Sequence, residues 1–125
     1  MSRMRPETVI ARFSELLAEG DLDAMMDLYE PDAAFAPQPG ERVSGHESIR
    51  AALEGFVAVR PRVEGTIEKV IEAGDTALVT NRWRLSGTAP DGSPLSMAAT
   101  SADVLRRRPD GSWGIVIDDP WGAAA

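Results

Sequence analysis

Two aspartates in the C-terminal part of the chain stand among apolar residues that alternate as in β-strands. Asp103 shares its strand face with Leu95, Met97, Ala99 and Leu105, and Asp118 shares one with Val116. Two carboxyl groups on neighbouring strands inside one apolar cavity would have raised or mutually split pKa values, which suits acid/base catalysis. The alternation also allows a second interpretation, in which each aspartate ends its strand and faces solvent.

Asn81 interrupts another apolar strand face, formed with Ala77, Val79, Trp83 and Leu85. A buried amide costs about 1–3 kcal/mol if it has no hydrogen-bond partner. We therefore expect a protein group, a water molecule or a bound ligand to pair with Asn81.

Other catalytic chemistries lack the residues that they need. The chain has no cysteine, and it contains no phosphate-binding GxxxxGK(S/T), no dinucleotide-binding GxGxxG and no zinc-protease HExxH. His46 is the only histidine, and its place in the first turn of a predicted helix favours a surface or rim position. We expect no metal site and no cofactor.

Composition and charge narrow the class of protein further. The chain of 125 residues, with 43% hydrophobic and 26% charged residues, predicts one globular domain over residues 1–125. Its net charge of −7 argues against a nucleic-acid partner, and the run Arg106–Arg108 is expected at the solvated end of a strand. The first residues lack a signal-peptide pattern and no apolar run reaches the ~18 residues of a membrane span, so we expect a cytoplasmic protein without membrane contact.

Three helices must come first along the chain. Apolar residues recur at three- and four-residue spacing from Pro6 to Gly20, and a second short helix begins at Leu22, with Tyr29 on its apolar stripe, and ends at Pro31. Ser44 and Glu47 have capping-box spacing, which predicts a third helix that ends before Pro61.

The period then changes to two, which predicts four strands. They are expected over 63–71, 76–86, 94–107 and 113–118, with turns at Ala89–Gly92 and Pro109–Gly111. A shift of the apolar phase near Lys69 predicts a bulge in the first of them. Helices followed by an antiparallel meander indicate an α+β fold.

Several short motifs together resemble the nuclear transport factor 2-like superfamily, and most of all its SnoaL-like and ketosteroid-isomerase-like branch. They are Glu19–Asp23 between two helices, Leu28–Ala33, Ser44-Gly45 before a helix, and the closing Asp110–Asp118. The resemblance implies a cone-shaped, cystatin-like fold, in which a strongly bent antiparallel sheet wraps around about three N-terminal helices and leaves an apolar pocket at the open end. It also implies a homodimer through the outer face of the sheet.

The resemblance leaves the reaction open, because one fold supports many functions. Ketosteroid isomerase uses an aspartate base, a tyrosine and a protonated aspartate. In the resemblance these positions fall on Pro37, Phe13 and Asp103, so two roles are missing and steroid isomerisation by that mechanism is not expected. In the limonene-epoxide-hydrolase pattern, Asp103 and Asp118 occupy the two aspartate positions. Ser101 stands at the position where that pattern needs an arginine. Paired-histidine dehydratases are excluded, whereas SnoaL-type cyclases need little more than one aspartate.

We therefore expect a cofactor-independent acid/base enzyme of isomerase, cyclase or hydrolase type, acting on a mostly apolar carbonyl or epoxide ligand. Asp118 or Asp103 would move the proton, and Asn81 would hydrogen-bond the ligand oxygen. The residues expected to line the pocket are Phe13, Tyr29, Trp83, Met97 and Val116. The alternative is a non-catalytic ligand-binding or dimerisation module whose cone is filled by its own core.

Overall fold

The computed structural model describes residues 5–122, and the first four residues, on which the signal-peptide prediction partly depends, lie outside this range. The helices and strands follow in the order α1 (Pro6–Glu19), α2 (Leu22–Asp27), β1 (Tyr29–Phe35), β2 (Val43–Ser44), α3 (His46–Ala58), β3 (Arg62–Ala73), β4 (Thr76–Thr88), β5 (Pro94–Arg107) and β6 (Trp113–Asp119).

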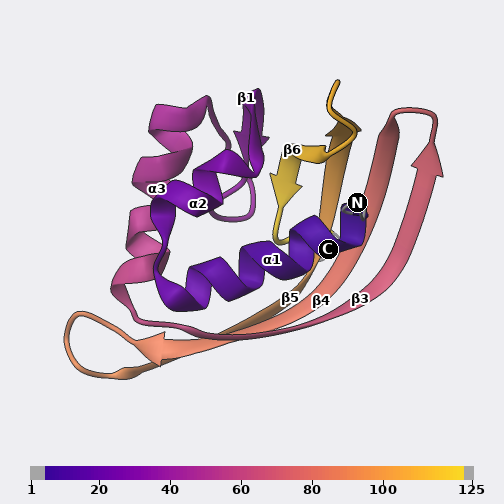
Figure 1. Ribbon diagram of the computed structural model, residues 1–125. Coiled ribbons are helices and arrows are strands. Elements are labelled where there is room, and N and C mark those ends of the chain that lie inside the picture. The colour runs from indigo at the N-terminus through magenta and orange to yellow at the C-terminus, as the bar shows by residue number, and fades with distance from the viewer. Residues whose placement is uncertain (1–4, 123–125) are drawn as a thin grey trace.

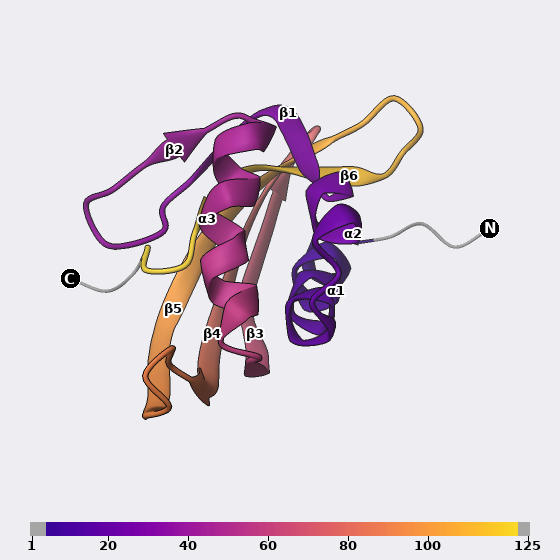
Figure 2. The ribbon, with the colours of Figure 1, turned by 90° about the vertical axis from the view of Figure 1, so that its left-hand side faces the viewer.

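All six strands form one open sheet in the order β2-β1-β6-β5-β4-β3. The long strands β3, β4 and β5 curve around α1, while the short strands lie together at the other end of the sheet (Figures 1 and 2). This confirms the α+β class and the bent sheet around three helices. The expectation of an antiparallel sheet is corrected in one respect: the sheet is mixed, because β1 runs parallel to β6 while the other neighbours are antiparallel.

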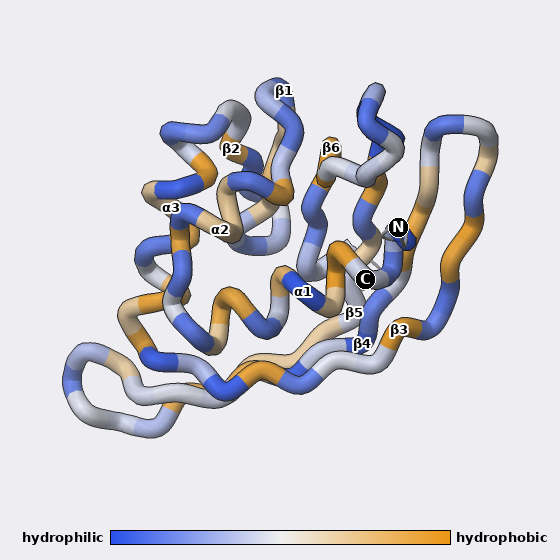
Figure 3. Tube along the Cα trace, viewed as in Figure 1, coloured by the Kyte–Doolittle hydropathy of each residue, from blue (hydrophilic) through white to orange (hydrophobic). Residues whose placement is uncertain are grey.

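Helices α1 and α3 pack their apolar sides against the sheet. Apolar residues recur along both helices between hydrophilic ones (Figure 3). Val9 and Leu16 of α1 and Ile49 and Leu53 of α3 are almost fully buried, and together with Met25 they form the core against the inner face of the sheet. No helix within residues 5–122 is long and apolar enough to cross a membrane.

One predicted helix boundary and one predicted helix cap are wrong. Helix α2 ends at Asp27, and Tyr29 instead opens β1, where its backbone pairs with Ile115 of β6. The predicted capping box at Ser44 does not form, because Ser44 pairs with Ala34 in β2 and Gly45 is the N-cap residue of α3. Both errors have the same cause, since strand pairing with distant segments overrides the local pattern.

Two bulges set which side chains face inward. The predicted bulge in β3 is confirmed by the shift of register between Ile67 and Lys69. A second bulge, in β6, was not predicted: Leu105 pairs with Ile115 and Val104 pairs with Ile117, which leaves Val116 as the extra residue. As a result Ile115 and Asp118 both face the interior, although they stand three positions apart.

Candidate active site

A cavity of about 70 Å³ lies between helices α1 and α3 and the inner face of the sheet, and it is partly open to solvent. Its wall is mostly apolar, with contributions from β1 and from β3 to β6. The polar side chains that line it, besides two tryptophans, are Ser14, Asn81, Ser101, Asp103 and Asp118. Among residues 5–122 no lysine, arginine or histidine lines the cavity, and the ionisable groups that line it there are carboxyl groups.

Asp103 and Asp118 are direct partners on the adjacent antiparallel strands β5 and β6. Both are buried, with exposed fractions of 2% and 6%. The Tyr29 hydroxyl donates a hydrogen bond to Asp118 Oδ2 at 2.5 Å, and Ser101 Oγ donates one to Asp103 Oδ2 at 3.0 Å. No donor within residues 5–122 reaches Asp103 Oδ1.

These surroundings shift the pKa values of the two carboxyl groups by different amounts. Burial raises the pKa of both, and for Asp103 the neighbouring charge of Asp118 raises the pKa further, to well above its usual range. The hydrogen bonds to Asp118, including the one from Tyr29, act in the opposite direction on its pKa. Burial, followed by the charge of Asp118, raises the pKa of Tyr29, so its phenol keeps the proton that it donates. The pKa of Asp103 is therefore raised further than that of Asp118, so Asp103 holds its proton more strongly.

Asn81 lies beside this pair on β4, and its exposed fraction is 5%. Its strand partners are Ile67 of β3 and Ser101 of β5, and Ser101 Oγ also lies 3.3 Å from the Asn81 carbonyl oxygen. The neighbouring position on β3 is Gly65, where a Cβ atom would come within 2.9 Å of Asn81 Oδ1. Gly65 thus leaves the space in which the Asn81 amide sits at the cavity wall.

Of the five residues predicted to line the pocket, some line the cavity and others do not. Phe13 and Trp83 line the cavity. Tyr29 does not, but it packs edge-on against Phe13 with ring centroids 5.9 Å apart, and its hydroxyl reaches Asp118. Met97 and Val116 do not line it, and this corrects the sequence-based expectation. Met97 packs against the core farther along β5, and Val116 is the bulge residue of β6.

Trp121 is a cavity residue whose role the sequence analysis missed. It lies just after β6 and packs edge-on against Trp83, with ring centroids 5.3 Å apart. Trp83 Nε1 donates a hydrogen bond to the carbonyl oxygen of Pro120 at 2.7 Å, which ties this segment to β4. The alternation of β6 ends before Trp121, so periodicity could not assign it to the cavity.

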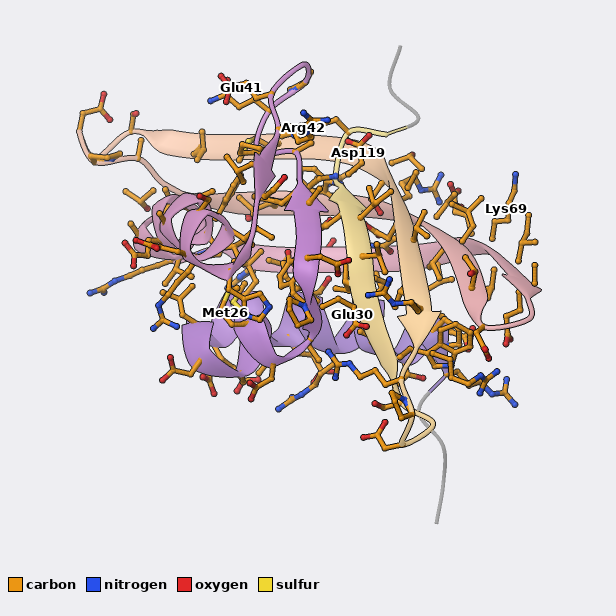
Figure 4. All side chains as sticks on the ribbon, turned by 90° about the horizontal axis from the view of Figure 1, so that it is seen from above. Met26, Glu30, Glu41, Arg42, Lys69 and Asp119 are labelled. Carbon is orange, nitrogen blue, oxygen red and sulfur yellow. The ribbon has the colours of Figure 1, made fainter. Side chains whose placement is uncertain are left out.

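His46 and the arginine run lie away from the cavity. His46 is exposed, and its Nε2 lies 3.2 and 3.1 Å from the carbonyl oxygens of Tyr29 and Glu30. Arg106 and Arg108 both bind the carboxylate of Glu30, which is 8% exposed and lies toward the opposite end of β6 from Asp119 (Figure 4). The arginine run lies at the end of β5, as expected, and two of its side chains also form an ion-pair cluster with Glu30 there.

No group of three or more metal-ligating side chains is present within residues 5–122. The chemistry that the cavity residues can perform by themselves is proton transfer, with an ionised carboxylate and a protonated carboxyl group side by side.

Comparisons with known proteins agree with this architecture. The family model of the SnoaL-like domain matches residues 10–114. No curated protein matches the sequence. Among solved structures, the chain is similar to an NTF2-like protein with a cystatin-like fold from Novosphingobium aromaticivorans (24% identity, TM-score 0.70, covering 88% of this chain and 74% of that one). This similarity confirms the fold class that was expected.

Two further structures of this fold carry different names. One is a ketosteroid isomerase-like protein from Erwinia carotovora atroseptica (19% identity, TM-score 0.75, covering 90% of this chain and 88% of that one). The other is named for a calcium/calmodulin-dependent protein kinase II association domain and comes from Xanthomonas campestris (23% identity, TM-score 0.75, covering 90% and 81%). At these identities the similarity shows the fold alone.

Proposed function

The chain belongs to the SnoaL-like domain family, and from this premise we propose that it is a cofactor-independent acid/base enzyme that moves a proton on a small, mostly apolar carbonyl ligand. The observation that carries the proposal is the pair Asp103 and Asp118, two buried carboxyl groups that line one cavity and have unlike hydrogen-bond partners. The name of the ketosteroid isomerase-like neighbour is consistent with this reaction class.

In the proposed reaction Asp118 is the general base. Its carboxylate takes a proton from the carbon next to the ligand carbonyl, and the electron pair of that C–H bond moves toward the carbonyl oxygen. The protonated Asp103 donates a hydrogen bond or its proton to that oxygen, and Asn81 donates a second hydrogen bond. Return of the proton to a different carbon completes an isomerisation and restores both carboxyl groups. Burial supports these roles, because a carboxylate of raised pKa is a stronger base.

The lining of the cavity narrows the ligand class. A phosphate or carboxylate would meet the charge of Asp118 with no cation among the lining residues of the described part of the chain, which argues against an anionic ligand. At about 70 Å³ the cavity is far smaller than the ~300 Å³ typical of sites for drug-sized ligands. A ligand with a single small ring suits so small a volume best. Part of that ligand can extend through the open side of the cavity.

The test uses the β,γ-unsaturated isomer of cyclohexenone as the substrate. Its conversion to the conjugated ketone moves one proton and is followed by ultraviolet absorption. We expect the wild type to accelerate the conversion, and we expect Asp118→Asn to lose about 10²–10⁴-fold of that rate. The exposed Asp32 offers a matched control, because Asp32→Asn removes a carboxylate outside the cavity. Equal rates for the wild type and Asp118→Asn would refute the proposal.

A second candidate function is a non-catalytic association module, and one observation favours it. Ile71, Leu78, Val104 and Ile117 are register partners on β3, β4, β5 and β6, so they form a continuous apolar row across the outer face of the sheet. Ile71 and Ile117 are 51% and 45% exposed. We propose that a second copy of the chain covers this row, which gives the homodimer expected through the outer face. The two functions are compatible, because the cavity opens on the other side of the sheet.

The expectations of a cytoplasmic location and of a single domain stay predictions from the sequence. The net charge of −7 supports the expectation that no nucleic acid is bound.

A further inference from the structure

The indole nitrogen of Trp121 is a buried hydrogen-bond donor without an acceptor among residues 5–122. The other buried side-chain atom without a partner in this range is Asp103 Oδ1. Both residues line the same cavity. Native proteins leave few buried polar groups unpaired. Asp103 already shares a hydrogen bond with Asp118. The Trp121 indole is therefore the atom that indicates a partner from outside the chain.

Trp121 is held in place at several points. Its backbone nitrogen donates to Asp119 Oδ1 at 3.2 Å, and its ring packs edge-on against Trp83. The Trp83 indole is in turn fixed by its hydrogen bond to the carbonyl oxygen of Pro120. These contacts hold the backbone of Trp121 and pack its ring against Trp83, while the Nε1–H has no acceptor among residues 5–122.

Asp103 Oδ1 and Trp121 Nε1 differ in the kind of hydrogen-bond partner that each can use. A proton on Asp103 turns one of its oxygens into a donor, and the neighbouring carboxylate of Asp118 supplies an acceptor for it. The Trp121 N–H has no such option, since an indole nitrogen only donates. A hydrocarbon in the cavity would leave this donor unpaired, whereas an oxygen atom with a lone pair would satisfy it. Discrimination of this kind, between a ligand that pairs a buried polar group and one that does not, is a strong source of specificity.

We propose that Trp121 Nε1–H donates a hydrogen bond to an uncharged oxygen of the bound ligand and is thereby a specificity-determining residue. The inference rests on the proposed function in one respect, because it requires a ligand in that cavity. It adds a requirement that the acid/base pair does not impose: the ligand carries an acceptor oxygen that reaches the Trp121 side of the cavity.

The test uses nuclear magnetic resonance of the indole N–H groups, because the chain has three tryptophans and so gives three indole signals. The probes are conjugated cyclohexenone and cyclohexene, which differ in the carbonyl oxygen. Trp121→Phe assigns the signal of Trp121 and removes its N–H while keeping an aromatic ring. Trp113→Phe is the matched control, since Trp113 is buried under Arg107 and does not line the cavity.

We expect cyclohexenone to move the Trp121 indole proton downfield in a saturable manner, while cyclohexene does not. The signal of Trp83, whose N–H already binds the Pro120 carbonyl, and that of Trp113 should move much less. Trp121→Phe should bind the ketone about fivefold more weakly and the hydrocarbon with unchanged affinity. Trp113→Phe should bind both like the wild type.

Equal ketone affinity in Trp121→Phe and the wild type would overturn the inference, and so would a Trp121 signal that stays in place when the ketone is bound. In either case a water molecule, and not the ligand, pairs the indole. Isomerisation with an unmoved indole signal would overturn this inference alone. Ketone binding that depends on Trp121, without any isomerisation, would support the inference and refute the proposed acid/base function.

Discussion

Asp103 and Asp118 face one cavity as direct cross-strand partners, but Asp118 alone receives a hydrogen bond from a tyrosine. The hydrogen bond acts to lower the pKa of Asp118, while the pKa of Asp103 is raised well above its usual range. Because the two groups are coupled, their protons come off in two macroscopic steps that belong to the pair. A reaction that needs one base and one acid should then show a bell-shaped dependence of rate on pH.

Tyr29→Phe should move the acidic limb of that profile to higher pH. The Tyr29 hydrogen bond acts to lower the pKa of Asp118, so its loss raises that pKa further and delays formation of the base as pH rises. The measurement is the pH dependence of kcat/KM for enone isomerisation. Phe13→Leu is the control, because Phe13 contacts the Tyr29 ring without bonding to Asp118 and should alter the rate without moving the limb. An acidic limb unchanged in Tyr29→Phe would contradict the assignment of Asp118 as the base.

Asp103→Asn should make the protein more stable at neutral and alkaline pH. The folded-state pKa of Asp103 is raised, so the folded protein binds the proton more tightly than the unfolded chain does. Stability is therefore highest below the unfolded pKa of ~3.9 and decreases as pH rises through the folded pKa. A neutral amide removes this dependence, and the gain at pH 7 is about 1 kcal/mol or more.

Urea denaturation of the wild type and Asp103→Asn across the pH range measures this effect. The exposed Asp91 is the control, since its pKa is lowered by hydrogen bonds from Ser93 and its contribution to stability has the opposite sign. Parallel stability curves for the wild type and Asp103→Asn would show that Asp103 is not the protonated member.

Local sequence patterns predicted part of the candidate site. The strict alternation of β4 and β5 identified Asn81 and Asp103 as inward-facing, and both are buried. Asp118 was also singled out, but on the argument that it shares a face with Val116. The bulge at Val116 reverses that phase, and Asp118 faces inward together with Ile115 instead. An extra residue in a strand leaves little trace in the period of a short apolar run, so the error was not visible in the sequence.

The parts of the site that the sequence did not predict depend on contacts between distant segments. Tyr29 looked like a helix residue because it continues an apolar stripe, yet its parallel pairing with β6 places it in a strand and brings its hydroxyl to Asp118. Trp121 follows the last strand and reaches the cavity only because Trp83 and Pro120 hold it there. The helical and strand segments could be read from periodicity, whereas these tertiary partners could not.

Ile117→Lys should weaken self-association of the chain. Ile117 stands in the apolar row on the outer face, and a charge there would be buried against a second copy. Sedimentation velocity over a range of concentrations is the measurement, and a tenfold or larger rise in the dimer dissociation constant is expected. The control is Arg84→Lys. Arg84 is exposed on the outer side of β4 and lies outside the apolar row. A wild type that stays monomeric at high concentration would exclude the proposed dimer.

Gly114→Ala should destabilise the fold by about 2 kcal/mol, in the range for disruption of a buried charged network. Gly114 is buried in β6, and a Cβ atom there would collide with Glu30 Oε2 and Arg108 Nε, which form a partly buried ion pair. Gly55→Ala is the matched control, because Gly55 lies in α3 with open space around its Cβ position, and alanine there should stabilise the helix by up to about 1 kcal/mol. Thermal and urea unfolding of the two variants compare the same chemical change at a closed and an open position. Equal stabilities of Gly114→Ala and the wild type would mean that Glu30 and Arg108 can move apart at no cost in free energy. The ion pair would then not stabilise this end of the sheet.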